Sequence, residues 1–152
     1  MTTLEDLYNS QILELAANIP LSGRLDRPDA TASAHSKLCG STITIDLEMD
    51  GDRVSDFRQT VKACLLGQAS AAIMGRHVIG ARAADLRAVA EGVRRMLKQA
   101  APAPDDWPEL KLLEPVRTYK ARHASTLLVF DAVEDAIRQI EVRRGAAGSK
   151  HA

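Results

Sequence analysis

An alternating run that ends in a tight-turn signal constrains the fold of this 152-residue chain more than any other feature. Over residues 42–49, apolar side chains at the odd positions alternate with polar ones, among them Asp46 and Glu48. This period of two predicts a strand with one buried face and one solvated face. Asp50-Gly51 follows directly and favours a hairpin turn, with pairing centred on these two residues. A return strand is therefore expected over residues 52–62.

Further elements are predicted on both sides of this hairpin. Residues 30–35 are interpreted as a short edge strand, and residues 3–19 have the spacing of a helix. After the strands, helical patterns are expected at these places: from Cys64 to about Met74, from Asp85, over residues 107–113, and from near Ser125. This order predicts an α+β fold, a three-stranded antiparallel sheet packed on one side by helices. Residues 1–145 are interpreted as a single domain and residues 146–152 as a flexible tail.

The balance of charge gives no support for binding to nucleic acid or to an anionic membrane surface. The chain has 20 basic and 20 acidic side chains, so its formal net charge is zero. No apolar run approaches the roughly 20 residues that span a bilayer, and the first residues do not resemble a secretory signal. We therefore expect a cytoplasmic protein without a membrane segment. A structural disulfide between its two cysteines, Cys39 and Cys64, would be unusual there.

The two cysteines are the first candidates for chemistry. Cys64 is expected at the N-terminus of a helix, which favours the thiolate, the form of cysteine that binds metals. Cys39 precedes a glycine that lets the backbone turn closely, and pairing across the hairpin brings it near Cys64. With His123 from the start of the last helix, two thiolates and an imidazole would suit zinc or an iron–sulfur cluster. The spacing is not that of a Cys-x-x-Cys pair, and the alternative is that both cysteines are simply buried.

Four segments resemble one protein family. Residues 63–71, Ala-Cys-Leu-Leu-Gly-Gln-Ala-Ser-Ala, resemble the Gly-Cys-Ala-Ile-Ser-Gln-Ala-Ser-Ala signature of IscU/NifU/SufU-type iron–sulfur cluster assembly scaffolds. Cys39-Gly40-Ser41 is similar to the family's Cys-Gly-Asp, and His123-Ala124-Ser125 to its His-Cys-Ser. Leu113-Glu114-Pro115-Val116-Arg117 resembles the Leu-Pro-Pro-Val-Lys segment that an Hsp70-type chaperone recognises. The similarity extends over nearly the whole chain.

The resemblance implies a SufE/IscU-like fold and a scaffold or cluster carrier that is not an enzyme. It implies that Cys39, Cys64 and His123 bind a transient iron–sulfur cluster, iron or zinc. The implied partners are a cysteine desulfurase, apo-protein acceptors and an Hsp70-type chaperone that docks at residues 113–117. The protein is expected to be a monomer or a weak homo-oligomer.

Two departures from the family pattern leave alternatives open. The third cysteine is absent: Ala124 occupies its position in an IscU-like register and Ser125 in a SufU-like register. The family's aspartate is replaced by Ser41. Ser41 and Ser125 are candidates for hydrogen bonding around the metal ligands, and Ser125 is also a candidate N-cap. The alternatives are a zinc-binding or metal-free regulatory protein that acts on a desulfurase, and a sulfur-relay enzyme that uses Cys64.

Overall fold

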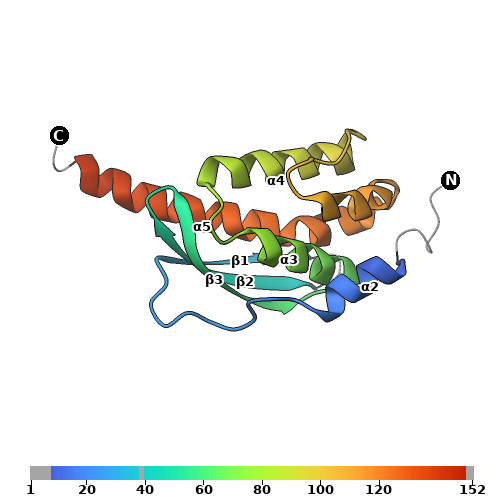
Figure 1. The fold of residues 1–152 in the computed structure, drawn as a ribbon, viewed down its shortest axis with the longest axis horizontal. Coiled ribbons are helices and arrows are strands. Elements are labelled where there is room, and N and C mark those ends of the chain that lie inside the picture. The colour runs from blue at the N-terminus through green and yellow to red at the C-terminus, as the bar shows by residue number, and fades with distance from the viewer. Residues whose placement is uncertain (1–7, 38–39, 150–152) are drawn as a thin grey trace.

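The fold is an antiparallel sheet with helices stacked on one of its faces (Figure 1). The computed structural model describes residues 8–37 and 40–149. The strands occur in the order β1-β2-β3, and they are β1 (Ala30–His35), β2 (Thr42–Asp50) and β3 (Arg53–Lys62). The predicted edge strand, hairpin and α+β class are all confirmed.

The register of the hairpin differs from the expected one. Asp50 pairs with Arg53, so the turn is centred on Gly51 and Asp52, and Gly51 has a φ of 62°. A bulge at Glu48 and Met49 adds a further shift. As a result, Ile43 pairs with Val61, three residues further along β3 than a turn centred on Asp50-Gly51 would give.

Two helices, α3 and α5, lie directly on the sheet, and α4 lies on the far side of α5 (Figure 1). The helix α2 packs against α3, and η1 packs against α4. The apolar faces of α4 and α5 are buried, because these faces form the core between the layers. The helical elements are α2 (Ser10–Ala17), α3 (Leu65–His77), α4 (Ala83–Lys98), the 3-10 helices η1 (Pro108–Thr118) and η2 (Lys120–Arg122), and α5 (His123–Ser149).

Several helix ends differ from the sequence prediction. The N-cap of α2 is Asn9, whose side chain accepts a hydrogen bond from the Ile12 amide, and residues 3–7 lie outside the described ranges. The N-cap of α4 is Arg82, so Asp85 lies within the first turn. The expected short helix at 107–113 continues as a 3-10 helix to Thr118. In the described part of the chain, no helix combines the length and apolar character needed to cross a bilayer.

The second face of the sheet is not fully solvated, because the segment between α2 and β1, residues 18–29, runs beside it. We call these residues the covering segment. This segment first pairs with β3: the Gly23 amide donates to the Gln59 carbonyl, and the Gln59 amide donates to the Leu21 carbonyl, both at 2.9 Å. The chain then passes β2 before it enters β1. A sequence pattern that is local to one strand carries no information about such a covering segment.

Asp46 lies under this segment and is fully buried, so the expectation that it faces solvent is wrong. Its carboxylate accepts hydrogen bonds from Arg24 Nε at 2.7 Å, the Leu25 amide at 2.9 Å and Thr31 Oγ1 at 2.6 Å. Burial alone would raise the pKa of Asp46, but these hydrogen bonds together outweigh burial and hold its pKa below the usual value. Asp46 thus joins the covering segment and β1 to the central strand.

Candidate functional site around Cys64

Cys64 is the N-cap residue of α3, and its side chain is half-buried. Its backbone is extended, with φ −63° and ψ 170°, and its side chain makes no capping hydrogen bond. Its amide donates to the hydroxyl of Ser41 at 3.1 Å, which ties the start of α3 to the start of β2. The sulfur is therefore not used to cap its own helix and is directed to a neighbouring element.

That neighbour is Ser125, in the first turn of α5. Cys64 Sγ donates to Ser125 Oγ at 3.3 Å, and Ser125 Oγ donates to the Arg122 carbonyl at 3.2 Å. Ser125 is 1% exposed, whereas Ala124 is exposed. Of the two residues that could stand for the missing cysteine, it is Ser125 that touches Cys64. Ser125 is not the N-cap of α5, because the helix begins two residues earlier, at His123.

A glycine allows α3 and α5 to approach at this point. A Cβ atom on Gly67 would lie 2.8 Å from Ala63 Cβ and 3.2 Å from the Ser125 carbonyl oxygen. Both distances are shorter than ordinary van der Waals contact, so no larger residue fits without a shift. Gly67 is part of the signature stretch, and its role here is to let the backbone of Ser125 lie against the first turn of α3.

Cys39 lies outside the described residues, but Ser36, Gly40 and Ser41, which are described, belong to the connection between β1 and β2. The Gly40 amide donates to the Ser36 carbonyl and the Ser36 amide donates to the Ser41 carbonyl, both at 2.8 Å. Gly40 has a φ of 69°, which favours glycine. The residue that follows it, Ser41, is the one that accepts from the Cys64 amide. The side chain of Ser41, two residues after Cys39, thus links this connection to the start of α3.

His123 is buried, and its described contacts lie on another side of α5 from Ser125. Its Nε2 lies 3.1 Å from the carbonyl oxygens of Val116 and Arg117, so Nε2 carries the proton that makes these hydrogen bonds. Residues two apart are separated by roughly 200° around an α-helix. His123 also lines a cavity of about 550 Å³ together with Lys98, Lys120 and other residues. Within the described ranges, no three His, Cys, Asp or Glu side chains form a metal-binding group.

The predicted chaperone-docking segment, residues 113–117, belongs to η1. Leu113 and Val116 are fully buried. Arg117 donates to the Ala101 carbonyl at 3.0 Å, and Glu114 accepts from the Ala103 amide at 3.3 Å. The segment is folded against the preceding connection in this state, and Leu113 and Val116 are not at the surface.

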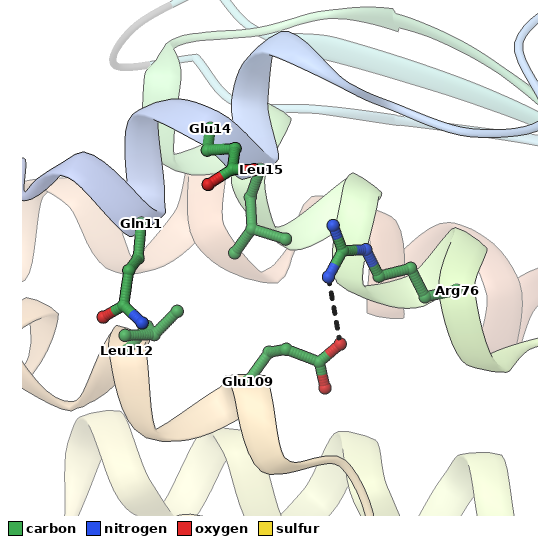
Figure 2. A pocket seen from close by; sticks show the side chains of 6 residues that line it. All are labelled: Gln11, Glu14, Leu15, Arg76, Glu109 and Leu112. Atoms are coloured by element: carbon green, nitrogen blue, oxygen red, sulfur yellow. Dashed lines mark ion pairs between the residues drawn. The ribbon is translucent and has the colours of Figure 1, made fainter.

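The start of η1 is held to α3 by a small cluster of charges around Glu109. Figure 2 shows Glu109 and Arg76 facing each other, with Leu112 next to Gln11, and all four side chains line a cavity of about 170 Å³. Glu109 Oε2 lies 3.5 Å from Arg76 Nη1, and Glu109 Oε1 lies 2.9 Å from His77 Nε2. The ring of His77 stacks on Trp107. Burial alone would raise the pKa of Glu109, but its hydrogen bonds and these basic neighbours outweigh burial and lower its pKa.

We expect Glu109→Gln to loosen η1 with little effect on the rest of the fold. The variant should lower the free energy of unfolding by about 1 kcal/mol, because it removes a partly buried charge-assisted contact. Since the pKa of Glu109 is lower in the folded state, this loss should be present above the unfolded carboxyl pKa and fade as the pH falls through the folded value. Hydrogen exchange at residues 108–118 should quicken. Unchanged exchange there would contradict the anchoring role.

Comparison with known proteins agrees with the resemblance seen in the sequence. The model of the family described as NifU-like N terminal domain matches residues 7–144. The chain is 26% identical over 136 residues to the iron–sulfur cluster assembly scaffold protein IscU of Thermotoga maritima, covering 88% of this chain and 94% of that protein. It is 25% identical over 140 residues to the protein of the same name from Streptococcus pyogenes serotype M1, covering 91% and 87%.

A solved structure shows the same fold at higher identity. The crystal structure of a nitrogen-fixing NifU-like protein (N-terminal) from Brucella abortus is 57% identical, with a TM-score of 0.90, and the match covers 91% of this chain and 96% of that one. The helices and the three-stranded sheet described above are therefore those of an IscU-like α+β fold. The chain belongs to the NifU-like N-terminal domain family, a family of iron–sulfur cluster assembly scaffolds and not of catalysts.

Proposed function

We propose that this protein is an iron–sulfur cluster assembly scaffold or cluster carrier that works as a single domain of residues 1–145. Its cargo, iron or a transient cluster, binds to Cys39 and Cys64, with His123 as the third ligand. The observation that carries the proposal is the position of Cys64. Its sulfur faces the first turn of α5, and its amide is bound by Ser41, the second residue after Cys39.

The surroundings of Cys64 suit a metal-bound sulfur. The N-terminus of α3, a helix of 13 residues, stabilises negative charge at this position. Cys64 as a residue is half-buried, so the site is neither fully open to solvent nor enclosed in the core. With no third cysteine, the cargo would keep an open coordination position, which suits a cluster that must be released to an acceptor.

His123 can serve as a ligand only through Nδ1. Metal-binding histidines commonly donate their other ring N–H to a backbone carbonyl, and Nε2 of His123 already does so. Because His123 and Ser125 face different sides of α5, the His123 ring does not lie beside Cys64 in this structure. We therefore expect His123 to contribute less to binding than either cysteine.

The proposed partners follow from this role. A cysteine desulfurase would supply sulfur, and apo-proteins would accept the cluster. An Hsp70-type chaperone would recognise residues 113–117, and this requires η1 to open, because Leu113 and Val116 are buried. A 3-10 helix is less stable than an α-helix of the same length, so such opening is accessible.

Reconstitution tests the proposal directly. The protein is purified anaerobically and loaded with iron and sulfide, and its metal content and visible absorption are recorded. We expect the wild type to take up a cluster, and Cys64→Ala and Cys39→Ala each to lose about tenfold or more in metal affinity. His123→Ala should lose less, and the control Ser33→Ala, a substitution at an exposed position of β1, should lose nothing.

Three outcomes would count against the proposal. Cluster uptake that neither cysteine substitution affects would overturn the site. Stoichiometric zinc without cluster uptake would favour the zinc-binding regulatory protein. Failure to bind either metal, combined with tight binding to a desulfurase, would favour the metal-free regulator.

A further inference from the structure

We propose that Ser125 is a positioning residue for Cys64 whose hydrogen bond reverses on loading. In the empty protein its hydroxyl accepts from the Cys64 thiol, and in the loaded protein it donates to the Cys64 sulfur. This inference rests on the proposed function, because it concerns Cys64 as a ligand of the cargo.

The hydroxyl of Ser125 has a single proton to donate. A serine hydroxyl has one O–H donor and two lone pairs. In the structure, the O–H points to the Arg122 carbonyl at 3.2 Å, and a lone pair accepts from Cys64 Sγ at 3.3 Å. The hydroxyl therefore cannot donate to Arg122 and to Cys64 at the same time.

Loading removes the proton that the Cys64 thiol now donates. A divalent metal and a thiol give a metal-bound thiolate and one proton, which passes to solvent, and no electron is transferred. The sulfur then presents only lone pairs to Ser125 Oγ at a separation where two acceptors repel each other. The repulsion is relieved when the Ser125 hydroxyl rotates and donates its proton to the sulfur.

The rotation leaves no carbonyl unpaired, because Thr126 provides a second donor. Thr126 Oγ1 donates to the same Arg122 carbonyl at 2.7 Å, a shorter contact than that of Ser125. The carbonyl of Arg122 thus keeps a partner when Ser125 turns away. Ser125 is 1% exposed and Thr126 is fully buried, so water does not readily replace either hydroxyl. Because of these two neighbouring hydroxyls, the reversal of the hydrogen bond has a small free-energy cost.

The position of Ser125 also has a consequence for the bound cargo. A hydrogen bond to a ligand sulfur withdraws electron density from it and tunes the metal. Ala124, which is exposed, offers no such donor. A serine in contact with Cys64 therefore adjusts the properties of the sulfur without adding a third thiolate.

The empty-state half of the proposal can be tested without any cargo. In a Cys39→Ala background, Cys64 is the only thiol, and its S–H stretching band can be followed by infrared spectroscopy. We expect the band to move to higher frequency in Ser125→Ala, because a hydrogen-bonded thiol absorbs at lower frequency. Ser125→Thr, which keeps the hydroxyl, should restore the band, and the distant control Ser33→Ala should leave it unchanged. A band that does not move in Ser125→Ala would overturn this half.

The loaded-state half uses cobalt(II) as the probe in the full chain with both cysteines. The sulfur-to-cobalt charge-transfer band should move to lower energy in Ser125→Ala, because a hydrogen-bond donor stabilises the sulfur lone pair. Thr126→Val, which is close to isosteric and keeps Ser125, should move the band in the same direction, since Ser125 must then stay with the Arg122 carbonyl. Ser125→Thr and Ser33→Ala should match the wild type.

The outcomes separate this inference from the proposed function. If cobalt binds to the wild type and its band does not move in Ser125→Ala, the reversal is wrong and the metal site stands. If the wild type binds neither cobalt nor a cluster, the proposed function fails, and the donor half of the inference fails with it. In that case, an infrared shift would show only that Ser125 holds the thiol.

Discussion

Asp46→Asn is expected to lower the free energy of unfolding by about 3 kcal/mol at neutral pH, within the range for breaking a buried charge-assisted network. The carboxylate is fully buried and accepts from Arg24, the Leu25 amide and Thr31. Asparagine has nearly the same shape, but it has lost the negative charge and one acceptor oxygen. The segment that runs beside the sheet would then lose its main attachment to β2.

The effect should depend on pH in a defined direction. The folded-state pKa of Asp46 is lowered, so its contribution is complete above the unfolded carboxyl pKa of about 3.9 and is lost as the pH falls through the folded value. The difference between wild type and Asp46→Asn should thus be constant above about pH 5 and shrink in more acidic buffer. Urea denaturation at a series of pH values measures this difference directly.

Glu48→Gln is the matched control, since Glu48 lies two residues further along β2 and is only half-buried. It should change the free energy of unfolding by less than about 0.5 kcal/mol. A similar loss in both variants would mean that β2 tolerates no change of charge at all. A difference between wild type and Asp46→Asn that persists unchanged in acid would show that the charge of Asp46 is not what stabilises the fold.

Asp46 also shows where prediction from the sequence ends. The alternation along β2 correctly predicts the strand and places Ile43, Ile45 and Leu47 in the core. It places Asp46 on the opposite face, which is correct, but it predicts that this face is solvated. What buries Asp46 is a segment that lies some 20 residues earlier in the chain and has no period of its own. Alternation identifies the two faces of a strand but not what covers each of them.

At the candidate site, too, the sequence predicts a local feature correctly but does not predict a contact between elements that are distant in the chain. The sequence predicts that Cys64 begins a helix, and it is the N-cap of α3. It leaves open whether Ala124 or Ser125 stands for the missing cysteine, because this depends on where α5 begins and how it is rotated. In the structure α5 begins at His123, which buries Ser125 against Cys64 and leaves Ala124 exposed. The rotation of α5 about its axis is set by its packing against α3. Alignment of the sequence to the family leaves a choice of one residue, and it contains no information about this packing.

Gly67→Ala is expected to lower the free energy of unfolding by about 2 kcal/mol, the usual range for overpacking a tight contact. In an exposed helix the same substitution would raise stability by up to about 1 kcal/mol, because alanine favours helix. Here the added methyl group would meet Ala63 Cβ at 2.8 Å and the Ser125 carbonyl oxygen at 3.2 Å. Neither atom is at the end of a flexible side chain, so the strain is relieved only by backbone movement, which shifts Ala63, just before α3, and separates α3 from the first turn of α5.

That separation should reach the candidate site, because the contact between Gly67 and Ser125 lies one helical turn from Cys64. We expect Gly67→Ala to weaken cobalt(II) binding by about tenfold, similar to the loss of a group that orients a metal ligand. Gly145→Ala in α5 is the control: a Cβ there meets nothing within 4 Å, so the variant should be at least as stable as the wild type and bind cobalt normally. Gly67→Ala could instead be destabilised and still bind cobalt as tightly as the wild type. The spacing between α3 and α5 would then not set the geometry of Cys64. In that case Ser125 could not be the group that positions the Cys64 sulfur.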